Sequence, residues 1–355
     1  MKYWVLDNSG YTATMLWESG VLTLSNGLTE RKIDAKKGTV SLVNQTEGIS
    51  YLHELKQDIL LTIDGREVEF YKEVVFLEYS EIPMREDLHY RPQFATEEVV
   101  YPPKGKAAML RYSLGALEVR VIYEIFDGIP VVAKRLHIIN NSSKTVVVNR
   151  IFVDSLAMDA DAYAMFYAET NYNGGCGHNN NRTLSVQYAD GVLNLGFDIG
   201  PDAEVAAGET FTGLRAYELL HTARYYEQKM IEVKEMYKRI APWVLESPLI
   251  FHITSDIQKL LREAIDDISE VGFDMLIQSF GSMVNLENIG PFNIWRHKKV
   301  YTYARSKGIA AGGYTLAIIK NYRPIKGLER NPNDKAGIVR CLATEWSVKY
   351  WKNIL

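Results

Sequence analysis

Alternating apolar and polar residues dominate the first part of the chain and predict β-strands there. The longest such unit is residues 116–143, ALEVRVIYEIFDGIPVVAKRLHIINNSS, in which Val119, Val121, Tyr123 and Ile125 fall on one face. Residues two apart share a face of a strand, so this spacing predicts a strand with one buried side. Pro130 stands at the start of the return strand, where a missing N–H is tolerated. The unit is typical of a long β-hairpin.

Turn dipeptides separate the other alternating runs. Asn26-Gly27, Asp64-Gly65 and Asp190-Gly191 each lie between two such runs. A type I′ turn needs a positive φ at both central residues, and Asn-Gly and Asp-Gly meet that need best. With so many short strands and little helical periodicity, residues 1–215 are predicted to form a large β-sandwich.

The period changes near residue 216. Apolar residues then recur at spacings of three and four, at Leu219, Ala223, Tyr226, Met230, Val233, Tyr237 and Ile240. This spacing predicts a long amphipathic helix, ended by Pro242, within a linking segment of residues 216–247. Its expected role is to pack against the sandwich or the next domain.

Residues 248–355 begin with strand and helix patterns in strict alternation. Three apolar runs, 248–254, 273–281 and 309–317, predict buried strands, and 255–272 and 293–308 predict helices between them. Ser255 and Gln258 fit a capping box for the first helix, and Gly272 fits its C-terminal stop. Short strand–helix–strand connections imply parallel strands. The pattern predicts the start of an α/β barrel or of a doubly wound sheet.

Composition places the protein among soluble multidomain proteins and narrows its partners. The 355 residues are 47% apolar and 24% charged, with a net charge of −4 and no basic block, so we expect no nucleic-acid partner. No apolar run approaches the length of a membrane span, so we expect no membrane association. The N-terminal MKYWVLDNSG has no apolar signal region. This favours a cytoplasmic protein, or a secreted or periplasmic one if a signal peptide was removed.

Neither a cofactor nor a metal is expected. Phosphate-binding and dinucleotide-binding glycine motifs, H-E-x-x-H, C-x-x-C and G-x-S-x-G are all absent from the sequence. Residues 171–183, NYNGGCGHNNNRT, carry one Cys and one His, which are too few ligands for a metal site on their own. A surface or cleft-rim loop explains them better, and its Asn side chains could hydrogen-bond a sugar.

Four segments of the chain together resemble a known family. YEIFDGIPVVAKRLHIINNS (123–142) is similar to the sandwich core of the α-galactosidase clan of retaining glycosidases, in particular its bacterial members with an N-terminal β-supersandwich. Residues 208–253 resemble that clan's last sandwich strand, linking helix and first barrel strand. Residues 264–282 and 301–317 resemble the second and third barrel units. The resemblance implies a supersandwich at 1–215, a linking helix at 216–247, and the first three strand–helix units of a (β/α)8 TIM barrel at 248–355.

The sequence departs from this family at the sites of chemistry. Close α-galactosidases end their second barrel strand in Asp-Asp-Gly-Trp, whereas this chain has Gln278-Ser279-Phe280-Gly281, so galactose is only the default sugar. In the clan the nucleophile follows the fourth barrel strand and the acid/base follows the sixth. A full barrel takes about 250 residues, and only 108 run from Pro248 to Leu355. We therefore expect an N-terminal fragment that contains no catalytic residue.

Five residues at the predicted strand ends are candidates for sugar binding: Asp256, Gln278, Ser279, Tyr314 and Thr315. Barrel enzymes bind substrate at this edge, which explains the choice. Each has a plainer alternative. Asp256 fits a partner of the helix dipole, and the Gln278–Ser279 pair fits a cap of the next turn. Tyr314 fits a core aromatic as well as a stacking platform for a sugar.

Two functional hypotheses follow. In the first, the parent protein is a retaining glycosidase that hydrolyses α-linked oligosaccharides or glycosides, and this chain alone is inactive. In the second, the chain is a non-catalytic carbohydrate-binding or structural module. An incomplete barrel leaves strand edges unpaired, so the second hypothesis requires either a partner or a compact three-stranded rearrangement, and a homo-oligomer is left open.

Overall fold

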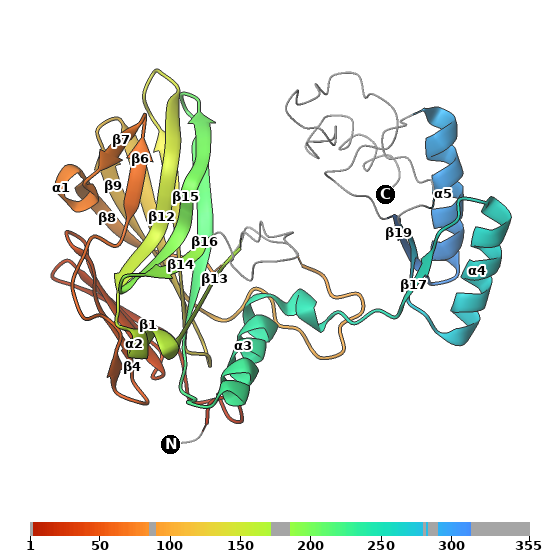
Figure 1. The fold of residues 1–355 in the computed structure, drawn as a ribbon, viewed down its shortest axis with the longest axis horizontal. Coiled ribbons are helices and arrows are strands. Elements are labelled where there is room, and N and C mark those ends of the chain that lie inside the picture. Colours follow the sequence, from red (N-terminus) through yellow and green to blue (C-terminus); the bar gives the residue numbers. More distant parts are fainter. Residues whose placement is uncertain (1–2, 85–89, 172–184, 280–281, 283–289, 314–355) are drawn as a thin grey trace. The chain divides into compact units, whose positions relative to one another are not determined.

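The computed structural model describes residues 3–84, 90–171, 185–279, 282 and 290–313. It divides into two compact units. The first unit consists of Met1–Pro92 and Glu97–Leu245, and the second consists of Gln93–Thr96 and Glu246–Leu355. Figure 1 shows the elements of each unit, which are described separately below.

Three antiparallel sheets build the first unit (Figure 1). The N-terminal sheet has the order β1 (Thr14–Glu18), β2 (Val21–Ser25), β3 (Thr29–Asp34), β4 (Gly38–Asn44), β5 (Ile49–Ser50). The largest sheet has the order β13 (Phe166–Thr170), β16 (Thr210–Leu220), β11 (Val131–Asn140), β10 (Leu117–Phe126), β9 (Gly105–Leu114), β8 (Val75–Ile82). The third sheet has the order β14 (Val186–Ala189), β15 (Val192–Val205), β12 (Val146–Ala157), β6 (Leu60–Ile63), β7 (Arg66–Val68). The predicted β-sandwich is confirmed.

Helices are few in this unit. They are α1 (Phe70–Glu73), α2 (Ala160–Ala164), α3 (Tyr226–Ile240) and the 3-10 turn η1 (Pro242–Leu245). The linking helix was predicted from a period that began at Leu219, and that start is wrong. Leu219 lies in β16, which pairs with β11 on one side and β13 on the other. A strand buried on both faces has no clean alternation, so its apolar residues can mimic helical spacing.

The predicted hairpin of residues 116–143 is confirmed by the register of β10 with β11, in which Val121 faces Leu136. Val119, Tyr123 and Ile125 are buried in the core that the three sheets share. The opposite face of the largest sheet is also covered at one end. There a second apolar cluster joins the sheet to α3, with Val233, Met236 and Ile240 on the helix. A sheet flanked by a second sheet and by a helix explains why the end of β10 is buried on both sides.

Two of the three predicted type I′ turns are confirmed. Asp64 and Gly65 have φ of 50° and 74°, and Asp190 and Gly191 have φ of 50° and 71°. Both central residues therefore have the left-handed backbone that this turn requires.

The third predicted turn, at Asn26-Gly27, is wrong in type. Only Gly27 has a positive φ, of 84°. Asn26 is buried, and its side-chain amide donates hydrogen bonds of 2.7 Å to the carbonyls of both Phe126 and Ile129. Its side-chain oxygen also accepts from the N–H groups of Leu28 and Thr29 in the local hairpin. The residue therefore joins its own hairpin to the turn between β10 and β11, a long-range contact that a dipeptide signal cannot report.

A cluster of buried charges crosses the sandwich core. Arg31 on β3 pairs with Asp154 on β12 at 2.6 Å and with Glu218 on β16 at 2.8 Å, so one guanidinium joins all three sheets. Lys134 on β11 pairs with Asp154 at 3.2 Å and with Asp58 at 2.9 Å. All five side chains are at most 1% exposed. Buried charges persist only when they are paired and hydrogen-bonded, as these are.

The cluster contains two cations and three carboxyl groups. Protonation of one carboxyl group, that of Glu218, would make the positive and negative charges equal in number. Burial raises the pKa of the Glu218 carboxyl well above its ordinary value, and the neighbouring Asp154 raises it further, against the attraction of Arg31. Glu218 Oε1 has no donor among the described residues. A proton on this oxygen makes it a donor toward Asp154, and two cations then face two carboxylates. Burial and the contact with Asp154 therefore both favour the protonated form of Glu218.

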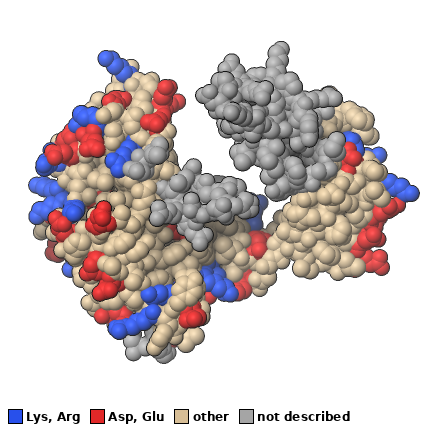
Figure 2. All heavy atoms as spheres, viewed as in Figure 1, with Lys and Arg blue, Asp and Glu red and all other residues tan. Residues whose placement is uncertain are grey.

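Surface charge is mixed on the side of the molecule shown in Figure 2. There Lys and Arg are interspersed with Asp and Glu over the first unit, as the net charge of −4 leads one to expect. A mixed surface generates no strong field of one sign on that face. None of the helices in the described part of the chain is long and apolar enough to span a bilayer.

The second unit is built on a parallel sheet, as predicted. Its order is β17 (Ile250–Ile253), β18 (Met275–Gln278), β19 (Ala310–Gly313), with α4 (Gln258–Val271) and α5 (Pro291–Ser306) as the intervening helices. Both strand pairs are parallel. A separate apolar core contains Leu261 and Ile265 of α4, Leu276 of β18, and Val300 of α5. The three strands and two helices, which alternate in the sequence, thus share one apolar core.

The predicted caps of the first helix have different outcomes. Gly272 ends α4 in the left-handed conformation with φ of 88°, as predicted. The capping box is wrong, because α4 begins at Gln258 and its N-cap is Ile257, with no side-chain cap. Ser255 lies too far upstream, and its Oγ accepts from the N–H of Ile257 at 3.1 Å.

The second unit also takes in a short segment from the middle of the chain. Ala95 forms an antiparallel bridge with Glu246. The Glu246 carboxylate accepts a hydrogen bond of 2.9 Å from the N–H of Gln93 and another from the N–H of Phe94. The chain therefore passes between the units three times, near residues 92, 96 and 245.

The charge state of Glu218 predicts how two substitutions compare. Glu218→Gln keeps an acceptor for Arg31 and a donor for Asp154, so the free energy of unfolding should change by less than about 1 kcal/mol. Arg31→Met strips the buried carboxylates of their cation and should cost about 3–5 kcal/mol. Urea unfolding at pH 7 measures both. An equal loss in the two variants would show that Glu218 is ionised.

The lowered pKa of Asp58 predicts that the protein loses stability at low pH. The charges of Lys134 and Arg31 outweigh burial and lower the pKa of Asp58 from 3.8 to about 2. A carboxyl whose pKa is lower in the folded state stabilises the fold above its unfolded pKa, and the effect is lost as pH falls from about 4 toward 2. The expected contribution is about 2 kcal/mol. The free energy of unfolding, measured with urea between pH 5 and 2, should fall less steeply for Asp58→Asn than for the parent chain. Parallel curves would show that Asp58 does not have a lowered pKa in the folded state.

Candidate functional site

The carboxyl-terminal edge of the parallel sheet is the first candidate site. Ile253 is paired with Gln278, and Gln278 with Gly313, so β17, β18 and β19 end at the same level. In parallel α/β proteins the residues just beyond this edge bind ligands. The candidate residues Asp256, Gln278 and Ser279 lie here.

Gln278 is fully buried and both ends of its amide are used within the second unit. Its Nε2 donates to the backbone carbonyl of Ser255 at 3.0 Å, and its Oε1 accepts from the Tyr301 hydroxyl at 3.1 Å. The side chain thus ties the segment after β17 to α5. These partners already occupy one donor and one acceptor position of the amide, so its first role is to hold the strand edge in place. Its contact with a sugar stays a prediction.

Ser279 lies at the accessible side of the same edge. Its N–H donates to the carbonyl of Ile253 at 2.9 Å, and its own carbonyl accepts from the N–H of Ser282 at 3.0 Å. Its half-buried hydroxyl lies 3.4 Å from Nδ1 of His252, which is exposed. This hydroxyl and imidazole are the groups of the edge that a ligand could reach most directly.

Asp256 is engaged by a cation that the sequence did not reveal. Its carboxylate pairs with the Arg296 guanidinium on α5 at 2.9 Å, and the same guanidinium donates to the Asp256 carbonyl. Gln258 Nε2 in turn donates to the Arg296 carbonyl at 3.1 Å. Asp256 precedes the first residue of α4 by two positions. The ion pair is thus a further role for this carboxylate, beside the helix dipole and a sugar.

His297, the next residue on α5, is 3% exposed. Burial lowers the pKa of its imidazole, and the neighbouring Arg296 lowers it further. The ring is therefore neutral at pH 7 and adds no positive charge to this edge. It lies beside Tyr301, with 6.1 Å between ring centroids.

The edge as described offers hydrogen bonding rather than acid–base chemistry. A retaining glycosidase needs two carboxyl groups about 5–5.5 Å apart. Among the candidate residues that the structure describes, Asp256 is the sole carboxylate, and it is paired. No group of three or more His, Cys, Asp and Glu side chains that could hold a metal occurs in the described ranges. Tyr314, Thr315 and the loop of residues 172–183 lie outside the described residues.

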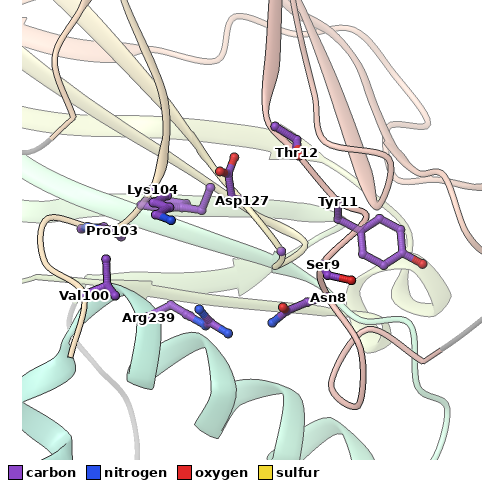
Figure 3. A pocket seen from close by; sticks show the side chains of 11 residues that line it. Asn8, Ser9, Tyr11, Thr12, Val100, Pro103, Lys104, Asp127 and Arg239 are labelled. Carbon is purple, nitrogen blue, oxygen red and sulfur yellow. The ribbon is translucent and has the colours of Figure 1, made fainter. Parts of the chain in front are cut away.

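A pocket of 260 Å³ in the first unit is the second candidate site (Figure 3). Its lining comes from four separate segments: residues 8–12, residues 100–104, the turn between β10 and β11, and the last turn of α3. Lys104 and Arg239 bring two cations to it, and Asp127 brings a carboxylate. Sequence patterns gave no sign of this site, because no two of the four segments form a local motif.

The order of the elements along the chain defines a two-part architecture. A β-sandwich of three antiparallel sheets is followed by a linking helix and by alternating strands and helices with a parallel sheet. This order matches the predicted architecture of a sandwich joined to an α/β domain.

Solved α-galactosidases share this fold. The galactosidase domain of the α-galactosidase–sucrose kinase AgaSK matches with a TM-score of 0.58 and 10% identity over 96% of this chain and 64% of its own. The GH36 α-galactosidase AgaB from Geobacillus stearothermophilus gives 0.59 and 9% identity over the same shares. The α-galactosidase from Lactobacillus brevis gives 0.55 and 11% identity over 98% and 62%. The fold relationship predicted from sequence is confirmed.

These matches rest on structure alone. No protein-family model matches the sequence, and no curated protein resembles it in sequence. The chain spans less than two thirds of the length of these α-galactosidases.

Removing the Gln278 side chain should loosen the edge without any ligand. Gln278→Leu leaves the Ser255 carbonyl and the Tyr301 hydroxyl unpaired, at a cost of about 1–3 kcal/mol for each group that stays buried. Hydrogen exchange of the β18 and α5 amides should accelerate accordingly. Ser279→Ala is the matched control, because its half-buried hydroxyl has one long contact, and it should change exchange little. Unchanged exchange in Gln278→Leu would mean that the amide is free for other partners.

Proposed function

We propose that this chain is the sandwich and the beginning of the barrel of a retaining glycoside hydrolase that acts on α-linked sugars, with α-galactosides as the default class. In this proposal the first unit is the β-supersandwich, and β17, β18 and β19 are the first three strands of a (β/α)8 barrel. The observation that carries the proposal is the alignment of 96% of this chain with α-galactosidases across both units at TM-scores near 0.6.

The parallel sheet supports the barrel assignment in particular. A barrel needs parallel strands with helical crossovers, and the described part of the second unit contains three such strands and two helices. Sugar hydroxyls are the expected ligands of Ser279 and of the hydrogen-bonding groups around it. Another α-galactosidase of similar fold, AgaA from Geobacillus stearothermophilus, has been solved in complex with raffinose, which makes an α-galactoside a reasonable first ligand.

In this proposal the chain does not catalyse by itself. The carboxylate of Asp256 is paired with Arg296 at 2.9 Å, and it is the sole carboxylate among the candidate residues that the structure describes, whereas the retaining mechanism requires two. The family resemblance assigns the nucleophile and the acid/base to barrel strands four and six.

Hydrolysis of 4-nitrophenyl α-galactoside tests this division of labour. The 355-residue chain should release no nitrophenol above the buffer rate, because two positioned carboxyl groups supply most of the catalysis in this mechanism. Asp256→Asn provides the control if any rate is seen. A rate that disappears in this variant would place catalysis at Asp256 and contradict the proposal.

The protein purified from its native source tests the parent activity. We expect an intact mass tens of kDa above 40.4 kDa, together with α-galactosidase activity in the same fraction. A mass of 40.4 kDa without hydrolysis would refute the enzyme and favour a non-catalytic carbohydrate-binding or structural module. Equilibrium dialysis with raffinose would then measure whether the chain binds sugar.

A further inference from the structure

The pocket of 260 Å³ in the first unit has a frame that is fixed before any ligand binds. The N–H of Gly128 donates to the Tyr11 carbonyl at 2.8 Å, and the N–H of Ala13 donates to Asp127 Oδ1 at 2.8 Å. The N–H of Asp127 donates to the Lys104 carbonyl at 3.0 Å. These three bonds join the N-terminal segment, the β10–β11 turn and the segment before β9.

Further contacts hold the turn between β10 and β11 and leave no room for a larger residue at position 128. Asn26 donates two hydrogen bonds of 2.7 Å to the carbonyls of Phe126 and Ile129, on either side of the turn. Gly128 has φ of 74°, and a Cβ there would lie 3.1 Å from Asn8 Cγ. A side chain at position 128 would therefore press on the side chain of Asn8, so glycine leaves room for Asn8 at this side of the pocket.

Four polar side chains at the pocket have no partner among the residues that the structure describes. The side chains of Asn8, Thr12, Lys104 and Arg239 make no hydrogen bond or ion pair there. In Figure 3, Arg239 rises from α3 opposite Asn8 of the N-terminal segment, with Lys104 nearby on a third segment.

The pocket thus combines two unpaired cations with neutral hydrogen-bonding groups and one carboxylate. Two cations converging on one concave site favour an anionic oxygen group, because charged hydrogen bonds are the stronger ones. Asp127, whose Oδ1 is already held by Ala13, is suited to accept from a ligand hydroxyl rather than to meet an anion. Asn8 and Thr12 also suit hydroxyl groups. The volume lies just below the range of about 300–1,000 Å³ typical of drug-sized ligands.

We propose that this pocket binds a monosaccharide-sized polyol that carries one anionic group, either a phosphate or a carboxylate. Lys104 and Arg239 hold the anionic oxygens, and Asn8, Thr12 and Asp127 hold hydroxyls. The proposal goes beyond the glycosidase assignment and does not depend on it, since every residue used lies in the first unit.

A plainer role exists for one of the cations. Arg239 lies in the last turn of α3, where a positive charge is favoured by the helix dipole with no ligand present. That role predicts an effect on stability but none on ligand binding, so a binding measurement separates the two.

Isothermal titration calorimetry on the whole 355-residue chain tests the proposal. The probes are glucose 6-phosphate, glucuronate, glucose and inorganic phosphate, in buffer with about 20 mM NaCl. We expect one of the two charged sugars to bind with at least about ten-fold higher affinity than glucose and inorganic phosphate. Which one binds distinguishes a phosphate ligand from a carboxylate ligand. Raising NaCl to about 500 mM should weaken binding several-fold.

Two variants and a matched control locate the site. Lys104→Gln and Arg239→Gln should each weaken binding by about ten-fold. Lys234→Gln removes an equally exposed and unpaired cation of the same helix that does not line the pocket, and it should bind like the parent chain. Circular dichroism confirms that each variant is folded.

Three results would overturn the proposal. An equal loss of affinity in Lys234→Gln would show attraction to overall charge rather than to the pocket. Inorganic phosphate or glucose binding as tightly as the charged sugars would refute the ligand class. Absence of heat from any probe up to about 10 mM would refute the site. None of these results bears on the hydrolysis assays, so failure here and failure of the glycosidase proposal are distinguishable.

Discussion

The guanidinium of Arg31 is the point at which the first unit is joined. It reaches from the N-terminal sheet to a carboxylate on each of the other two sheets, at 2.6 and 2.8 Å, in a core from which water is excluded. A planar group with five donors in a fixed geometry is suited to this role. Apolar packing tolerates small sliding of one sheet over another, whereas a buried ion pair does not, because a shift of 1–2 Å leaves charges uncompensated. Arg31 thus links the three sheets at one point of the core that they share.

The placement of the sheets then determines where the exposed chemistry lies. Burial of the largest sheet on both faces requires α3 to lie against it, and α3 brings Arg239 to the turn between β10 and β11. Asn26 holds that same turn from the N-terminal sheet. The pocket therefore exists because several elements that pack for stability meet at one corner. Its unpaired side chains are the part of this corner that packing does not explain.

Sequence patterns recovered the elements whose signals are local. The turns at Asp64 and Asp190 need only two residues, and the strands of the second unit are marked by apolar runs between glycine stops. Features that depend on distant partners escaped. Leu219 has helical spacing but is paired with strands on both sides. Arg31 reads as one polar residue in an alternating strand, and only the fold brings it to Glu218.

The candidate site follows the same division. The positions of Gln278 and Ser279 at a strand end could be predicted, because an apolar run that stops at a polar pair is a local signal. The partners of that pair could not, since Tyr301 and Arg296 lie on the next helix and nothing near them in sequence marks their role. For the pocket, four segments contribute between one and four residues each. A sequence read in windows cannot assemble such a site.

The short segment at residues 93–96 has a consequence for synthesis of the chain. Its N–H groups are bonded by Glu246, a residue that the ribosome adds about 150 positions later. At about 5–20 residues per second this is a wait of about 8–30 s, during which the sandwich can form while this segment has no partner. The segment can therefore pair only after the residues that follow the sandwich have been synthesised, although it is made long before them.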